Sequence, residues 1–142
     1  MWLLVAFVLG LIVAVVVLRR VAAWLGRWRG FAGRRAERKA RRLLESAGYD
    51  ILNVHPKTDA VVIVDGRRVA IPILADFLVT RGSQRFAVEV KSGKERHVTS
   101  GATRRQLLEY ACAYDVDAVL LVDAVDRRIL EVRFPYAGKY GS

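Results

Sequence analysis

The stretch at residues 75–94 constrains the fold most, because it contains two apolar runs around a single turn. Gly82 and Ser83 lie at its centre, and glycine at the first central position fits a type II′ hairpin. A loop of two residues and a loop of four residues give the same register, in which Asp76 lies directly opposite Glu89. The sequence therefore predicts two carboxylates that face each other across neighbouring strands.

Charged side chains are costly in strands whose flanking residues are apolar. Lys91 follows Glu89 by two residues, so it points to the same face as Glu89. Two facing carboxylates repel each other unless a cation lies between them or one of them is protonated. A magnesium ion resolves the conflict, because it is a hard cation that prefers oxygen ligands. An ordinary ion pair of Lys91 with Glu89 or Asp76 on a solvated face is the alternative, and the sequence leaves both open.

The remaining apolar patterns predict an α/β fold, in which a mixed sheet carries helices on its faces. Asp65-Gly66 is a hairpin signal, Gly48 supplies a helix stop, and Pro72 indicates a bulge or an edge strand. The expected helices are 34–47 and 103–114. The expected strands are 51–54, 60–64, 68–71, 73–80, 85–91, 118–122 and 129–134, with a turn at 126–128.

An uncharged run at residues 2–18 precedes this domain. Seventeen helical residues span about 26 Å, just short of the hydrocarbon core of a membrane. Basic residues follow the run rather than precede it, so we expect a retained transmembrane anchor and not a cleaved signal peptide, which is the alternative. The expected location is the inner membrane, single-pass, with the amino terminus outside. The expected domains are 1–26 (anchor and interface helix), 27–33 (basic linker) and 34–142 (cytoplasmic domain).

The positive charge of the chain is concentrated behind the apolar run. Residues Arg19–Glu45 include ten basic and two acidic residues, hence +8 of the net charge of +10. This segment favours contact with anionic lipid, with Trp24 and Trp28 at the membrane interface, and nucleic acid is the second candidate partner. The single cysteine, Cys112, excludes an internal disulfide and is expected in the core.

Asp76, a short hairpin and Glu89-Val90-Lys91 together resemble the D…ExK core of the PD-(D/E)XK nuclease superfamily, with Ala75 in place of the nominal proline. Two further segments extend the resemblance. Residues 36–49 resemble the opening helix of that family, whose acidic residue is Glu37 here. Gln106 and Tyr110 resemble the Q-x-x-x-Y motif of the RecB-like branch. An exposed Glu37 paired with Arg41, and a Tyr110 that merely covers the core, are the alternatives.

The resemblance covers about residues 34–134 and implies a restriction-endonuclease-like fold. It implies a metal-dependent nuclease that hydrolyses phosphodiester bonds, with Mg²⁺ or Mn²⁺ as cofactor. The implied metal site consists of Asp76, Glu89, the Val90 carbonyl and Glu37. Lys91 would orient or deprotonate the attacking water, or stabilise developing charge, and Gln106 and Tyr110 would position the phosphate or the ligands.

The polar loop after the Glu-Val-Lys strand offers candidate contacts to a phosphate backbone. Lys94, Arg96 and Arg104 are expected to bind nucleic acid there; a solvated loop is the alternative. The expected function is hydrolysis of DNA, with RNA as an alternative substrate, in DNA repair, recombination or defence. A catalytically silent nuclease-fold module that tethers nucleic acid or a partner is the competing interpretation. A homodimer is compatible with either function.

Overall fold

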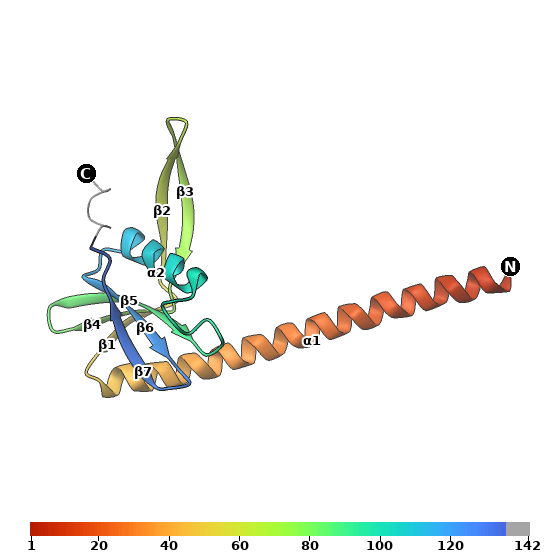
Figure 1. The fold of residues 1–142 in the computed structure, drawn as a ribbon, viewed down its shortest axis with the longest axis horizontal. Helices are drawn as coiled ribbons and strands as arrows, with labels where there is room; N and C mark the ends of the chain where they lie inside the picture. Colours follow the sequence, from red (N-terminus) through yellow and green to blue (C-terminus); the bar gives the residue numbers. More distant parts are fainter. Residues whose placement is uncertain (136–142) are drawn as a thin grey trace. The chain divides into compact units, whose positions relative to one another are not determined.

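The computed structural model describes the backbone of residues 1–135, with side chains except those of 2–6, 8, 9, 11 and 21–32. The chain divides into two compact units, Met1–Arg35 and Ala36–Ser142. Helix α1 (Trp2–Ser46) contributes residues to both units (Figure 1). The expected interfacial side chains of Trp24 and Trp28 lie outside the described part, as do residues 136–142 of the expected domain.

No helix within the described residues combines the length and the apolar character that crossing a membrane requires. The expectation of a transmembrane helix at residues 2–18, and with it a single-pass location in the inner membrane, is therefore wrong. The uncharged run is only part of a helix of 45 residues. That helix continues from the run into the arginine-rich segment behind it, and seventeen residues alone fall short of the roughly 30 Å hydrocarbon core.

The second unit is α/β, with a five-stranded mixed sheet in the order β1-β4-β5-β6-β7 (Figure 1), as the sequence predicts. Strands β5 and β6 are parallel and the other neighbours are antiparallel. Helix α2 (Gly101–Ala113) connects the parallel pair. The strands are β1 (Asp50–Val54), β4 (Phe77–Arg81), β5 (Gln84–Lys91), β6 (Ala118–Asp123) and β7 (Arg128–Val132).

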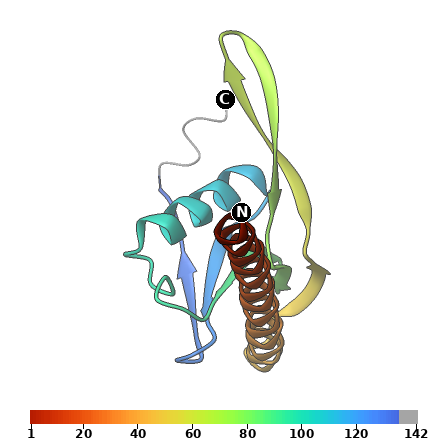
Figure 2. The same ribbon diagram turned by 90° about the vertical axis from the view of Figure 1, so that its right-hand side faces the viewer.

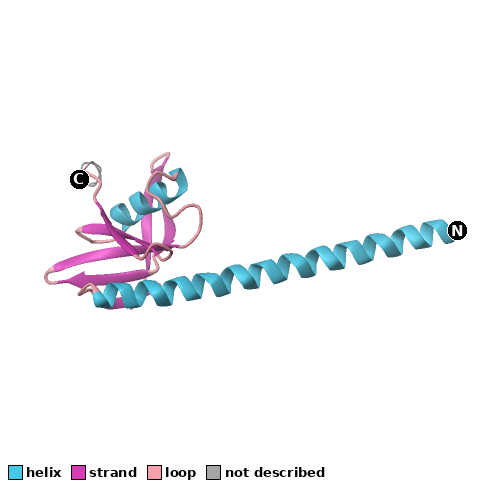
Figure 3. Ribbon diagram, turned by 60° about the horizontal axis from the view of Figure 1, so that its bottom comes forward, coloured by secondary structure: helices cyan, strands magenta, loops and turns pink. Residues whose placement is uncertain are grey.

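Two apolar clusters, one on each face, hold the sheet between helices (Figure 3). Ala40 and Leu44 of α1 pack on one face, against side chains that include Phe86 and Val88. Leu107 and Tyr110 of α2 pack on the other face. Because side chains alternate along a strand, β5 sends Phe86, Val88 and Val90 towards α1. Glu89 and Lys91 therefore point towards α2.

Helix α1 ends where the sequence predicts. Gly48 adopts a positive φ of 84°, a conformation that glycine reaches without steric cost. The Gly48 N–H donates to the Glu45 carbonyl (3.1 Å), and the Tyr49 N–H donates to the Leu44 carbonyl (3.0 Å). These bonds satisfy the last carbonyls of the helix and place Tyr49 in the core, edge-on to Phe86.

Strands β2 (Lys57–Val64) and β3 (Arg67–Leu74) form a separate two-stranded sheet that is inserted between β1 and β4. Asp65 and Gly66 both have positive φ at its turn, as expected for the Asp-Gly signal. The hairpin projects away from the five-stranded sheet (Figure 2). Pro72 lies inside β3 rather than ending it, so the expected strand 73–80 is wrong: residues 73 and 74 finish β3.

The predicted register of the second hairpin is confirmed. Phe77 pairs with Val88, and Arg81 pairs with Gln84 around a two-residue loop. Gly82 has a φ of 62°, as its place in the turn requires. One expectation about the core is wrong, because Cys112 is exposed on α2. Its helix has a single buried stripe, formed by Thr103, Leu107 and Tyr110.

Candidate functional site

Asp76 lies in the short link between β3 and β4, one residue before β4 begins. Its backbone is held on both sides. The His55 N–H donates to the Asp76 carbonyl (2.9 Å), and the Asp76 N–H donates to the Val88 carbonyl (3.1 Å). The Asp76 carboxylate accepts a hydrogen bond from the Val90 N–H at 2.7 Å. The carboxylate is therefore fixed beside β5 at Val90, the residue that follows Glu89.

The environment of Asp76 disfavours its charge. Burial is the largest cause, and the negative charges of Glu89 and Glu37 add to it, so the pKa of Asp76 rises to about 6. The Val90 N–H and His55 lower this pKa but do not offset the increase. A carboxylate held in this way gains from any cation that comes within reach of it.

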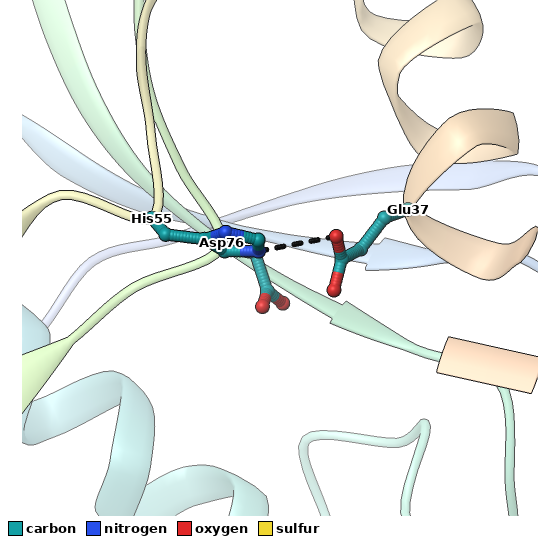
Figure 4. Close-up of side chains that lie close together, drawn as sticks. All are labelled: Glu37, His55 and Asp76. Atoms are coloured by element: carbon teal, nitrogen blue, oxygen red, sulfur yellow. Dashed lines mark hydrogen bonds and ion pairs between the residues drawn. The ribbon is translucent and has the colours of Figure 1, made fainter. Parts of the chain in front are cut away.

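Glu37, His55 and Asp76 form a cluster whose ligand atoms all lie within 4.8 Å of one another (Figure 4). Glu37 comes from α1, His55 directly follows β1, and Asp76 directly precedes β4. The Glu37 Oε2 lies 3.1 Å from the His55 Nε2. The dashed line in Figure 4 marks this contact. Two carboxylates and an imidazole converging on one point are a donor set that divalent cations accept.

His55 is the site residue that sequence reasoning missed, since it belongs to none of the motifs that the sequence offers. Its φ of 51° is left-handed, which is uncommon for a non-glycine residue and strained before a proline. Such strain persists where surrounding contacts impose it. Here the contacts are the Asp76 carbonyl and the Glu37 carboxylate. No sequence pattern could find His55, because the pairing of β1 with β4 spans the inserted hairpin.

Glu89 belongs to a second cluster on the α2 side of the sheet. The Glu89 Oε1 lies 2.7 Å from the Lys91 Nζ, and the side chains are 6% and 22% exposed. The ion pair that was the alternative therefore exists, but its carboxylate is buried and its lysine is half-buried, so it does not lie on a solvated face. The Glu89 Oε2 lies 2.7 Å from the Tyr110 hydroxyl. Both oxygens of Glu89 are thus engaged within the protein.

Gln106 and Tyr110 complete this second cluster from α2, four residues apart on one helix face. The Lys91 Nζ donates to the Gln106 Oε1 at 2.9 Å, and the Gln106 Nε2 donates to the Tyr110 hydroxyl at 2.9 Å. Tyr110 has one proton and two acceptors within reach, Glu89 and the Leu74 carbonyl at 2.8 Å. Burial, and then the charge of Glu89, raise the pKa of Tyr110, so its hydroxyl stays neutral.

The structure brings together all six side chains that the sequence singles out as catalytic, but in two clusters. We call Glu89, Lys91, Gln106 and Tyr110 the lysine cluster, and Glu37, His55 and Asp76 the carboxylate–histidine cluster. Glu89 adjoins Asp76 closely enough to raise its pKa, although it is not one of the three converging ligands. Val90 meets Asp76 through its N–H.

Of the three residues expected to contact nucleic acid, two are exposed and one faces acidic side chains within the protein. Lys94 is exposed in the loop before α2, and Arg104 is exposed on α2 with its Nη1 3.4 Å from the Thr99 carbonyl. Arg96 is turned inwards. Its Nε lies 3.1 Å from the Asp123 Oδ2 and 3.7 Å from the Asp126 Oδ2, a charge contact that is not aligned as a hydrogen bond. Arg96 therefore neutralises the end of β6.

No protein-family model, no curated protein and no solved structure matches this chain. The case for a function therefore depends on the geometry of the two clusters and on their charges.

Proposed function

We propose that this protein is a metal-dependent nuclease that hydrolyses phosphodiester bonds, with DNA as the first candidate substrate. The observation that carries the proposal is the meeting of two clusters at Asp76. A carboxylate of raised pKa lies among Glu37, His55 and Glu89, and a half-buried lysine is paired to Glu89. The resemblance to the PD-(D/E)XK core supports the same interpretation, because it selects all of these residues except His55.

The residues of the carboxylate–histidine cluster fit a divalent cation. Oxygen ligands suit Mg²⁺ and Mn²⁺, and an imidazole nitrogen suits Mn²⁺ better than Mg²⁺. The raised pKa of Asp76 is the independent sign of fit, since it reflects burial first and then the negative charges of Glu89 and Glu37, which His55 does not offset. When bound, such a cation lowers the pKa of a water molecule and stabilises charge on a phosphate.

Lys91 is the residue that we assign to the attacking water. Its ammonium is held by Glu89 at 2.7 Å and by the Gln106 carbonyl oxygen at 2.9 Å. Two fixed acceptors orient two of its three protons, which leaves the third for a water molecule or a phosphate oxygen. In this position Lys91 orients the water and stabilises negative charge that develops on the phosphate.

Gln106 and Tyr110 act as positioning residues in this scheme. Gln106 accepts from Lys91 with its oxygen and donates to Tyr110 with its nitrogen, so it links the two side chains that hold Glu89. Because Tyr110 is buried, its hydroxyl fixes the Glu89 carboxylate from the α2 side of the sheet. Supporting contacts of this kind determine the angle at which a ligand or a lysine meets its substrate.

Cleavage by the full chain tests the proposal. We expect the purified protein to cut single-stranded, duplex, flapped or four-way DNA, or RNA, in Mg²⁺ or Mn²⁺ and not in EDTA. Lys91→Gln should reduce the rate by about 10²–10³-fold, the usual cost of removing one charge-stabilising group. Lys57→Gln, an exposed lysine of the β2–β3 hairpin, is the matched control and should leave the rate unchanged.

Two results would contradict the proposal. One is the absence of cleavage on every substrate with either cation, in protein that circular dichroism shows to be folded. The other is an equal loss of activity in the Lys91 and Lys57 variants, which would trace the activity to a contaminant or to net charge.

A further inference from the structure

A basic pocket of about 280 Å³ lies on the α1 side of the sheet, away from the lysine cluster. Lys39 and Arg42 of α1 line it, together with Arg127 of the turn between β6 and β7. Ala40 and Leu43 of α1 add apolar lining. The volume is close to the lower end of the range for small-molecule sites, about 300–1,000 Å³. The pocket therefore has room for a hydrated phosphate group.

The three cations of this pocket have no acidic partner within the described residues. The ion pairs found there involve neither Lys39 nor Arg42 nor Arg127. The nearest acids along the turn, Asp123 and Asp126, face Arg96 instead. Three like charges around one cavity repel one another, and an anion in the cavity would relieve that repulsion.

Arg127 adds a second, independent observation. Its φ of 54° is left-handed, where glycine or asparagine would fit at less cost. Strained residues of this kind tend to occur at ligand contacts. At this turn the strain accompanies a long cationic side chain that lines the pocket.

The pocket adjoins the candidate nuclease site through the backbone. Glu37 of the carboxylate–histidine cluster precedes Lys39 on the same helix by two residues. On the sheet, the Ala124 N–H donates to the Lys91 carbonyl at 2.9 Å, and Ala124 lines the pocket. Helix α1 and the end of β5 thus contribute to the proposed site of cleavage, and both are also directly linked to the pocket.

We propose that this pocket binds a backbone phosphate of the nucleic acid, away from the phosphate that is cut. Its ligand class is a phosphodiester, recognised by charge and without reading of the bases. The role of this contact in holding a substrate rests on the proposed nuclease function. The binding of a phosphodiester in the pocket does not depend on it. Lys39, Arg42 and Arg127 would then be the main basic contacts to the nucleic acid in place of Arg96, because the charge of Arg96 is paired with Asp123.

Binding without cleavage tests the pocket directly. The probe is a fluorescent DNA duplex of about 20 base pairs, titrated with the full chain in EDTA over a series of salt concentrations. Each lost phosphate contact flattens the plot of log K against log salt by about 0.9. For the triple variant Lys39→Gln/Arg42→Gln/Arg127→Gln we expect a flattening of about 2 to 3 and at least a tenfold loss of affinity near 150 mM salt.

The matched control removes the same three charges elsewhere. Lys57→Gln/Arg67→Gln/Arg68→Gln neutralises exposed residues of the β2–β3 hairpin and should change the affinity less than twofold. Because all six residues are exposed, both triple variants should fold, and equal melting temperatures would verify this. If the two variants lose affinity equally, or if the pocket variant loses none, the proposal is wrong. Should the pocket triple fail to fold, its three single variants give the slope instead.

Cleavage separates this inference from the proposed function. If the wild-type chain cuts DNA and the pocket variant cuts it with unchanged KM and kcat, the pocket proposal fails while the nuclease stands. If the wild-type chain never cuts but the pocket variant still binds DNA less tightly than the control, the nuclease proposal fails while the pocket stands. A raised KM with unchanged kcat supports both.

Discussion

The two clusters at the site balance their charges in different ways. In the lysine cluster, Glu89 has a cationic partner at 2.7 Å and a hydroxyl at 2.7 Å. In the carboxylate–histidine cluster, Asp76 accepts a backbone N–H, but burial and then the charge of Glu89 raise its pKa to about 6. The first cluster is complete within the protein, and the second lacks positive charge. The difference indicates where a cation would bind and which group would face the water.

The largest effect should come from Asp76→Asn, which removes the uncompensated charge. We expect cleavage to fall at least about 10²–10³-fold, because a charge that holds the cation is lost. The metal-free protein should nevertheless be at least as stable at pH 8, since a neutral amide no longer carries the cost of burying a charge. Cleavage assays and urea unfolding in EDTA measure the two effects.

Glu89→Gln is the counterpart in the complete cluster. It should also reduce cleavage, but it should lower the free energy of unfolding, because Lys91 would lose its buried partner. A change in stability of the same sign and size in both variants would contradict the distinction between the clusters.

Tyr110→Phe should have the next largest effect. It removes the hydroxyl that contacts Glu89, the Gln106 amide and the Leu74 carbonyl. Leaving these buried groups without a partner should cost about 1–3 kcal/mol in unfolding free energy. The rate should fall about 10–100-fold, as is usual when a supporting contact of a site is lost.

Tyr114→Phe provides the comparison within the same helix region. Its hydroxyl contacts the Ala75 N–H at 3.0 Å and the carbonyls of Pro56 and Ile73. It should lose similar stability and change kcat less than twofold. Equal losses of kcat in the two variants would show that Tyr110 acts through folding alone.

The lysine cluster could largely be predicted from the sequence, and the carboxylate–histidine cluster only in part. The symmetry about Gly82 and Ser83 determines the register of β4 with β5, so this register can be predicted from local sequence alone. Gln106 and Tyr110 follow from helical spacing. His55 could not be found, because β1 meets β4 across an inserted hairpin of two strands. The Asp65-Gly66 signal predicts that hairpin, but nothing local indicates that β1 and β4 pair across it.

Two of the expectations that failed, the transmembrane helix and the core position of Cys112, share a physical cause. Apolar composition alone predicts burial in lipid for residues 2–18 and burial in the core for Cys112. Composition does not say how far a helix continues, or which of its faces is covered. Helix α1 continues into the basic segment, and Cys112 lies outside the buried stripe of α2.

The pH dependence of stability and of cation binding should distinguish the carboxylate–histidine cluster from the lysine cluster. The pKa of Asp76 is raised from 3.8 to about 6, so the folded state binds more protons than the unfolded state between these values. In EDTA, the stability contributed by Asp76 is therefore present below pH 3.8 and is lost as the pH rises through 6.

Bound Mn²⁺ must displace the same proton, so its affinity should fall about tenfold per pH unit below 6. Calorimetry in two buffers of different ionisation enthalpy gives the affinity and the number of protons released. Melting curves in EDTA give the stability. The Asp76→Asn variant should lose the change in stability between pH 4 and 7, and retention of that change would assign the titration to another group.

The smallest effect should come from His55→Asn, which tests the nitrogen ligand alone. Asparagine tolerates the left-handed φ of 51°, and the exposed Glu37–His55 contact is worth less than about 1 kcal/mol. The fold should therefore be unaffected. Because an imidazole suits Mn²⁺ better than Mg²⁺, we expect the variant to lose affinity for Mn²⁺ severalfold while its affinity for Mg²⁺ changes less than twofold. His97→Asn, the other histidine of the chain, is the control and should change neither. An equal loss of both cations would make His55 an electrostatic neighbour of Asp76 rather than a ligand.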